Sequence, residues 1–172
     1  MIKNDEQLAY SRVWASKFEE ANSKIKSNEE KRLSDPDGWQ LIQESNDALR
    51  QNLCREIVEY ETLVAHNPKE ALVLEIEDLN YLPHLLIKAR IALKLTPEEL
   101  AILSDHTEEE IIAFEVKNYH NASFVDFLAV SKALGIKVIA GKFMAQMDDF
   151  YIKELIDIRQ AKVENINTVG AS

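Results

Sequence analysis

Three consecutive glutamates, Glu108 to Glu110, are the most chemically distinctive residues of this sequence. A carboxylate can accept a hydrogen bond from the amino group of cytosine in the DNA major groove. It can also stabilise the first turn of a helix, by about 0.3–1 kcal/mol for each side chain. The glutamates follow Thr107 and precede Ile111 within residues 95–115, LTPEELAILSDHTEEEIIAFE. Base contact and helix capping are therefore both open interpretations.

The stretch around these glutamates predicts two short helices joined by a sharp turn. Thr96 is expected to cap the first helix, with Pro97 at its first position and Glu99 reaching back to the cap. Thr107 is expected to begin the second helix in the same way. Asp105 occupies the turn, where the chain usually needs a left-handed residue that glycine provides best and aspartate tolerates. The pattern therefore predicts a helix-turn-helix.

Other residue types that support catalysis or metal binding lack the spacing that such sites need. The sequence holds no glycine-rich phosphate loop and no nucleophile elbow, and its single cysteine, Cys54, is interpreted as a small buried hydrophobe. The four histidines show no metal-ligand spacing. They are His66, His84, His106 and His120. We therefore expect no catalytic residues, no metal and no cofactor, and the protein is not expected to be an enzyme.

The composition favours a helical protein with one domain, or a small domain with an appendage. The chain has 172 residues, of which 46% are apolar, and it has only four glycines and four prolines. The many tight turns of an all-β fold are therefore not expected. No run of about 18 apolar residues occurs, and the N-terminus lacks an apolar signal core. These features predict a cytoplasmic protein with no membrane segment.

The net charge of −10 is unfavourable for nucleic-acid binding, because contacts to phosphate dominate that affinity. Most of the acidic excess lies in the first part of the chain. Residues 1–78 carry 10 basic and 17 acidic side chains, whereas residues 79–137 carry 6 and 8. The region around the glutamates is thus closer to neutral, which weakens the objection to a nucleic-acid partner without removing it.

Residues 1–70 are predicted to form an antiparallel helical hairpin. Apolar residues recur at steps of three and four along two segments, which are separated by SDPDGW, where Pro36 and Gly38 are expected to interrupt the helix. The first stripe holds Tyr10, Trp14, Phe18, Ala21 and Ile25, and the second holds Trp39, Ile42, Leu49, Leu53, Ile57, Tyr60 and Val64. Two stripes joined by a short turn are expected to bury each other, with Trp14 and Trp39 in the core.

The remaining chain is predicted to form two further segments. Residues 71–141 contain the helix-turn-helix between two short strands, Ala71–Leu79 and Ile136–Gly141, which alternating or β-branched residues indicate. The two strands could pair with each other within one chain or with the strands of a second chain, and the sequence leaves both alternatives open. Residues 142–172 are predicted to form a C-terminal amphipathic helix and a tail. The hairpin, this helix, or both are expected to supply a dimer contact.

The stretch LLIKARIALKLTPEELAILSDHTEEEIIAFE resembles the XRE (Cro-type) helix-turn-helix of bacterial and phage repressors and of HigA-like antitoxins. The matching residues are Leu95, Thr96, Glu98, Glu99, Leu100, Ala101, Ile111, Phe114 and Glu115. The N-terminal part is similar to a helical hairpin that precedes the domain in one subgroup, and NYHNASFVDFLAVSKALGI resembles the segment that follows the recognition helix in longer family members. The resemblance implies a mainly α fold, with the hairpin followed by a lambda-repressor-like helix-turn-helix bundle. Two features depart from the family pattern: Pro97 stands where glutamine is common, and the glutamates stand where Lys, Arg or Gln is common.

The resemblance also implies a regulator that binds a double-stranded DNA operator as a homodimer. For the HigA-like subgroup it implies an antitoxin that represses its own operon and neutralises a basic toxin protein. The residues expected at the DNA are Lys88, Arg90, Thr96, Pro97, Thr107, Glu108, Glu109, Glu110, Ala113, Lys117, Asn118 and His120. The alternative hypothesis is a protein-interaction module, derived from a helix-turn-helix, that does not bind DNA. Pro97, the glutamates and the net charge favour this alternative.

Overall fold

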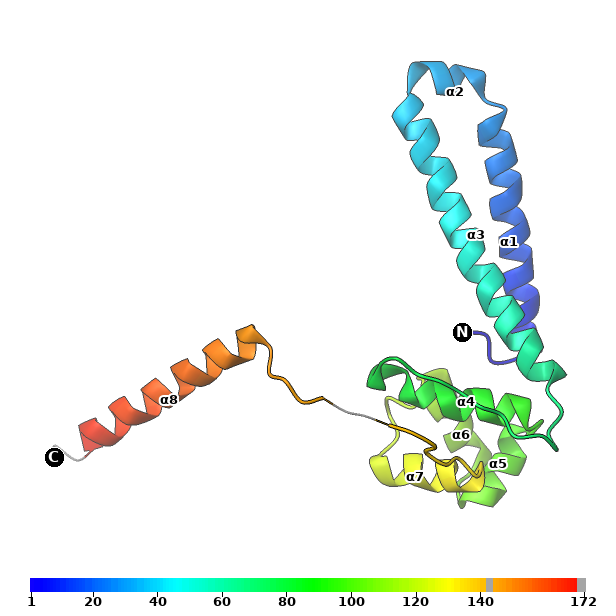
Figure 1. Ribbon diagram of the computed structural model, residues 1–172. Coiled ribbons are helices and arrows are strands. Elements are labelled where there is room, and N and C mark those ends of the chain that lie inside the picture. Colours follow the sequence, from blue (N-terminus) through cyan, green and yellow to red (C-terminus); the bar gives the residue numbers. More distant parts are fainter. Residues whose placement is uncertain (142–143, 170–172) are drawn as a thin grey trace. The chain divides into compact units, whose positions relative to one another are not determined.

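The computed structural model describes residues 1–141 and 144–169, and these are mainly helical (Figure 1). The predicted mainly α fold class is confirmed. The chain divides into two units, Met1–Ile136 and Lys137–Ser172. No helix in the described part of the chain is both long enough and apolar enough to cross a membrane.

The first unit begins with two long helices that lie side by side (Figure 1). α1 spans Asp5–Lys26, the short α2 spans Glu29–Ser34, and α3 spans Pro36–Ala65. The predicted interruption of the helix occurs at Asp35, between α2 and α3, but Pro36 and Gly38 lie inside the first turn of α3 and not between the helices. Asp35 caps α3 by accepting from the Gly38 N–H, so the proline sits at the first helical position, where it has no hydrogen bond to lose.

The contact between α1 and α3 is more polar than the two predicted apolar stripes implied. Ser11 and Asn22 are buried in it, and the Asn22 side chain donates to Asp47 over 2.7 Å. Trp39 is half-buried, and its indole N–H donates to the Ile25 carbonyl over 2.7 Å. Trp14 is likewise only half-buried. The two stripes therefore do not bury each other completely.

The two predicted strands are absent from the described residues. From Ala71 to Ile76 the side chains alternate between exposed and half-buried, as they would in a strand. This segment forms no ladder with any described segment and leads into a short 3-10 helix, Leu79–Tyr81. Ile136–Gly141 also forms no strand. The prediction was wrong because a strand requires a hydrogen-bonded neighbour, and alternation of side chains supplies only the pleat.

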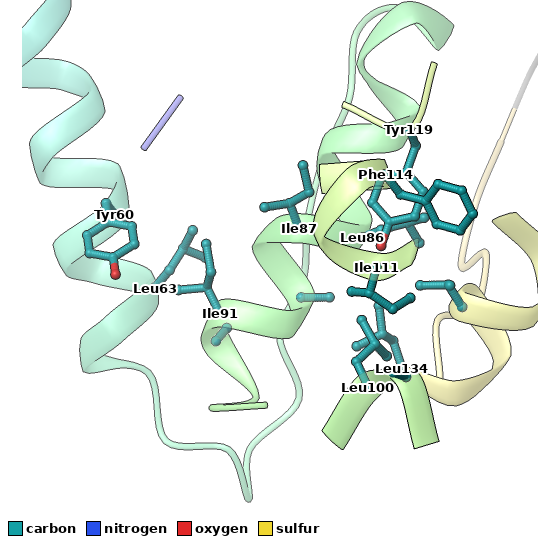
Figure 2. Packing of buried hydrophobic residues seen from close by; sticks show 14 of the residues in the cluster. Tyr60, Leu63, Leu86, Ile87, Ile91, Leu100, Ile111, Phe114, Tyr119 and Leu134 are labelled. Carbon is teal, nitrogen blue, oxygen red and sulfur yellow. The ribbon is translucent and has the colours of Figure 1, made fainter. Parts of the chain in front are cut away.

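Four further helices complete the first unit. They are α4 (Leu82–Ala92), α5 (Pro97–Ser104), α6 (Glu108–Val116) and α7 (Phe124–Ala133). Their largest fully buried side chains are Leu86, Ile87, Leu100, Ile111 and Val130. Figure 2 shows Leu86 beside Ile111 and Phe114, while Tyr60 and Leu63 of α3 approach Ile91 of α4. One hydrophobic cluster therefore contains residues from α3 as well as from α4–α7.

The second unit contains the predicted C-terminal helix. It is α8, which spans Asp149–Val169, and Asp148 accepts from the N–H of Phe150 at its start. Phe150, Ile152 and Ile156 are exposed within this unit, whereas Leu155 is half-buried.

Candidate nucleic-acid interface

α5 and α6 are joined by a turn that Asp105 makes possible. Asp105 adopts the left-handed conformation, with φ 60° and ψ 45°, and its N–H donates to the Ala101 carbonyl. The following His106 N–H donates to the same carbonyl over 3.0 Å. The expectation of a left-handed aspartate in the turn is confirmed. The turn ends α5 and lets the chain begin α6 at Glu108, three residues after Asp105.

Reciprocal capping boxes begin both helices, as the sequence predicted. The Thr96 hydroxyl accepts from the Glu99 N–H, and the Glu99 carboxylate accepts from the Thr96 N–H over 2.8 Å. Thr107 and Glu110 form the same arrangement, with 2.9 Å between the Thr107 nitrogen and the Glu110 carboxylate. Glu110 is therefore occupied in part by its own helix, and its capping role is established by geometry.

α6 has an inner side that anchors it and an outer side that is free. Ile111, Phe114 and Glu115 are buried. The exposed residues of α6 are Glu108, Glu109, Glu110, Ile112, Ala113 and Val116. None of the three glutamates is packed against another part of the first unit. A rigidly held helix with one free side has the form needed to enter a groove or to meet another protein.

Arg90 was predicted to contact DNA, and its position corrects that prediction. The side chain is buried on α4, and two of its nitrogens donate to the carboxylate of Glu115, with 2.7 Å between Nη2 and Oε2. Its third nitrogen donates to the Leu95 carbonyl over 2.9 Å. Its side chain therefore faces into the domain, where it fastens α4 to α6, and it cannot reach a phosphate outside.

Lys88 was also predicted to contact DNA, and its side chain points instead toward α3. Its ammonium group forms an ion pair with Glu59 of α3, and only about a fifth of the side chain is exposed. Burial, followed by the nearby Lys88 ammonium, lowers the pKa of His84 on the same helix. Lys88 therefore links α4 to α3, and binding of phosphate would require breaking that link.

The segment after α6 turns back sharply. Asn118 and Tyr119 both have positive φ, 49° and 58°, which is uncommon for residues other than glycine. The Tyr119 ring is buried against Phe114, with 5.6 Å between ring centroids, and the side-chain oxygen of Asn118 is buried as well. Lys117 and His120 remain exposed. Of the three residues predicted here, Lys117 and His120 are accessible to a ligand, whereas Asn118 is partly withdrawn.

Two residues that sequence reasoning missed hold α6 and its turn in place. Lys3, from the segment before α1, donates to the carbonyls of Glu115 and Val116 at the C-terminal end of α6, where a cation is favoured. Burial lowers the pKa of Lys3, and the Glu115 charge opposes that effect. His106 lies 3.5 Å from Asp126 of α7, and its other ring nitrogen meets the Ser104 hydroxyl. The contact of Lys3 with α6 and the contact of His106 with Asp126 both join segments that are distant in the sequence. No local sequence pattern could therefore have predicted them.

The exposed charge of the α4–α7 region is mainly acidic. Besides the three glutamates, the exposed acidic residues within residues 82–136 are Glu98, Glu99 and Asp105, whereas the exposed cations are Lys94, Lys117 and Lys132. Thr96, Thr107 and Ala113 are exposed, and Pro97 is half-buried. No group of three His, Cys, Asp or Glu residues in the described part of the chain gathers closely enough to hold a metal ion.

Comparisons of this sequence and structure with protein-family models, curated proteins and solved structures gave no significant match.

Proposed function

We propose that α4–α7 form a helix-turn-helix domain that binds double-stranded DNA, with α6 as the helix that enters the major groove. The protein would act as a transcriptional regulator in the cytoplasm. The observation that carries this proposal is the outer side of α6, which is exposed from Glu108 to Val116 and held rigidly by its buried side. α1 and α3 serve as an antiparallel hairpin attached to this domain.

The outer residues of α6 have partners among the groups that line the major groove. The Glu109 carboxylate can accept from the amino group of cytosine, and the side chains of Ile112 and Ala113 can contact the methyl group of thymine. Lys117 and His120, which follow the helix, are suited to the phosphate backbone. Glu110 contributes less, because its carboxylate already accepts from Thr107.

The ion pairs of Arg90 and Lys88 lower the number of phosphate contacts that the domain can make. With both cations held in ion pairs, Lys94, Lys117 and Lys132 remain exposed in this region. Each neutralised phosphate contributes about −0.9 to the slope of log affinity against log salt. Two or three contacts per copy therefore predict a shallow slope, about −2 to −3 per copy. Sequence preference must come mainly from base contacts and apolar contacts.

The experiment is a selection of binding sites from a pool of randomised duplexes, followed by titration of the enriched duplex. The Lys117→Glu variant should weaken binding to every duplex, because it removes a backbone contact. The Glu109→Gln variant should change which base is preferred. Lys26→Glu is the matched control. It changes the net charge by the same amount, and it lies at the end of α1, far from α6 in sequence. Failure to enrich any duplex would overturn the proposal.

A second candidate function is recognition of a basic protein without any DNA role. It is favoured by apolar residues that are exposed on the same two helices as the acidic residues: Ile102 of α5 exposes 74% of its surface and Val116 of α6 exposes 69%. A surface that combines exposed apolar and acidic residues matches a basic partner. By its resemblance to HigA-like antitoxins, the chain would have a small basic toxin as that partner.

Co-expression with neighbouring reading frames separates the two candidates. If the second is right, a basic protein should co-purify with the chain, and Ile102→Lys should abolish its capture. Leu33→Lys is the matched control, because Leu33 is a similarly exposed apolar residue on α2. If capture is unaffected by Ile102→Lys, or if no partner is captured, this candidate fails.

A further inference from the structure

The two flanks of the α1–α3 pair differ in character. Successive residues of a helix are about 100° apart. Because Ser11 and Asn22 are buried against α3, they define the side of α1 that faces its neighbour. One flank of α1 then holds Tyr10, Trp14 and Ala21. The other flank holds Arg12. On α3 the facing side is marked by two residues that contact α1, Trp39 and Gln43.

The second of these flanks is polar and already has an internal contact. Arg12 of α1 donates to Glu61 of α3 over 2.6 Å, and both side chains are about half exposed. In an antiparallel pair, positions displaced in the same rotational sense on the two helices lie on the same side of the pair. Glu61 follows Gln43 by 18 positions, five whole turns, so it lies on the facing side of α3, and Arg12 reaches it from the polar flank of α1.

The opposite flank is apolar and uncovered within the first unit. By the same helical positions, Tyr10, Trp14 and Ala21 of α1 share this side with Ile42 and Leu49 of α3, and we call these five residues the apolar flank. Tyr10 exposes 65% of its surface, Leu49 48% and Ile42 37%. A pair of helices whose contact is partly polar leaves much of its apolar surface for another partner.

Two opposite charges lie at the two ends of the outer edge of this flank. Lys24 follows Glu6 by 18 positions, which is five whole turns of a helix, so both lie on one line along α1. That line borders the apolar flank on the side away from α3. Both side chains are exposed, and among the described residues neither has an ion-pair partner. Lys17 lies between them, with its ammonium group 4.6 Å from the centre of the Trp14 ring, which already gives it a partner.

We propose that a second copy of this chain packs on the apolar flank, so that two α1–α3 pairs form a four-helix bundle in which α1 runs antiparallel to α1 of the other copy. The two-fold axis crosses α1 near Ala15, midway between Glu6 and Lys24. Each Glu6 then meets Lys24 of the other copy, which gives two ion pairs across the contact. At the same time Tyr10 lies over the small Ala21 of the other copy, so a large side chain meets a position with room for it.

The same axis brings apolar residues of the two α3 helices together. Because the Tyr60 hydroxyl donates to Asp5 over 3.0 Å, the level of Ala15 on α1 corresponds to a point on α3 about ten residues before Tyr60. That point lies between Leu49 and Leu53. Each Leu49 therefore approaches Leu53 of the other copy, and the half-exposed leucine becomes covered.

An axis parallel to the helices would instead set α1 of one copy against α3 of the other. Glu6 would then lie beside the acidic Glu56 and Glu59, whose charges are already paired with the N-terminus and with Lys88. Lys24 would face uncharged residues. This arrangement offers no ion pair at the edges, so the charges select the axis that crosses the helices.

The proposed arrangement sets the two α4–α7 domains at opposite ends of the bundle, because each is joined to the end of α3. Beyond the axis α3 continues for about 14 residues, so the ends of the two α3 helices are about 42 Å apart. Half-sites one turn apart on a duplex are separated by about 34 Å. If the proposed DNA binding is correct, two α6 helices at a comparable spacing would meet two half-sites. That consequence rests on the proposed function, whereas the dimer itself is measured without DNA.

The test is sedimentation equilibrium of the full chain across the micromolar range. The wild-type chain should be a dimer, and Leu49→Glu should weaken dimerisation by about tenfold or more, because it places a charge in an apolar contact. Tyr10→Lys, on the other helix of the apolar flank, should act in the same direction. Val58→Glu is the matched control: Val58 exposes 61% of its surface on α3 but lies on the polar flank, with Arg12. Far-UV circular dichroism verifies that each variant keeps its helix content.

A charge exchange tests the orientation. Glu6→Lys and Lys24→Glu should each weaken the dimer, and the double variant should recover most of the loss. Glu6 lies in the first turn of α1 and Lys24 in the last, so each single variant also opposes the helix dipole. The double variant carries both of these unfavourable changes, and recovery must therefore come from the contact between copies.

Three outcomes would overturn the proposed dimer. They are a wild-type chain that stays monomeric, a Leu49→Glu dimer as strong as the wild type, and equal weakening by Val58→Glu, which would show that the apolar flank has no special role. If Leu49→Glu weakens the dimer while the double charge variant recovers nothing, the proposed orientation is wrong.

Discussion

The ion pair between Arg90 and Glu115 gives the sharpest prediction about stability. The structure holds both groups inside the α4–α7 core, with the side chains only 10% and 8% exposed, and Arg90 makes a third hydrogen bond to Leu95. Replacement by methionine in Arg90→Met removes the cation and leaves the Glu115 carboxylate buried without its partner. Breaking a buried ion pair in this way costs about 3–5 kcal/mol.

That loss is a large part of the stability of a small domain, which is about 5–15 kcal/mol. The same magnitude follows from the hydrogen bonds, because each bond to a charged group contributes about 1.5–3 kcal/mol and two join Arg90 to the carboxylate. The double variant Arg90→Met with Glu115→Leu removes both charges. It should recover most of the loss, since apolar replacements of buried ion pairs are often neutral or stabilising.

Urea denaturation of the full chain, followed by far-UV circular dichroism, measures these free energies of unfolding. Lys117→Met is the matched control, because it removes an exposed cation that follows α6 and should change stability by less than about 0.5 kcal/mol. A loss below about 1 kcal/mol for Arg90→Met would refute the structural role. So would a variant of unchanged stability that binds DNA less tightly, since that outcome would return Arg90 to the interface.

Three further predictions concern caps, the turn and pH. Thr107→Ala should cost about 1 kcal/mol of unfolding free energy, because it removes the acceptor for the Glu110 N–H; the urea midpoint measures this, and no change would contradict the cap. Asp105→Val should destabilise by about 1–2 kcal/mol, whereas Asp105→Gly should be neutral or stabilising, since φ is 60° in the turn; the reverse order would show that the turn is not left-handed. Burial, followed by the hydrogen bond to Asp5, raises the pKa of Tyr60 to about 12, above the ordinary value of 10.0. The folded state therefore holds the Tyr60 proton more tightly than the unfolded state, and this contribution is complete below pH 10 and is lost as the pH rises toward 12. Unfolding followed between pH 9 and 12 should show a smaller decline for Tyr60→Phe than for the wild type, and equal declines would contradict the assignment.

Local signals in the sequence predicted the local features of the candidate site. The capping residues Thr96 and Thr107 were recognised from their spacing to a glutamate, and the left-handed Asp105 from its residue type at the turn, because each feature depends on residues within four positions of itself. These features depend on backbone geometry that nearly any environment preserves.

Contacts between distant parts of the chain were not predictable in the same way. Arg90 and Lys88 were expected at DNA because a cation near a helix-turn-helix looks free until its partner is known. Their partners, Glu115 and Glu59, are 25 and 29 positions away in the sequence. Lys3 lies more than 100 positions from the α6 carbonyls that it contacts, so its role had no local signal.

The exposure of apolar residues on α3 was also not predictable from local sequence. A stripe such as that of Ile42 and Leu49 predicts which side of a helix is apolar, and it does not say whether the neighbouring helix covers that side. The structure buries the polar Asn22 in the contact between the helices and leaves Leu49 half exposed. The strand-like segments fail for a similar reason, because side-chain alternation cannot supply the hydrogen-bonded neighbour that a strand needs.

The most direct measurement of the central claim is the affinity of the chain for its selected duplex relative to a shuffled duplex of equal length and composition. Fluorescence anisotropy at physiological ionic strength provides both constants. If α6 reads bases from its exposed side, the selected duplex should bind about 1,000-fold more tightly or better, and Glu109→Gln should shrink that ratio. Equal affinity for the two duplexes, or no binding of either, would contradict the account.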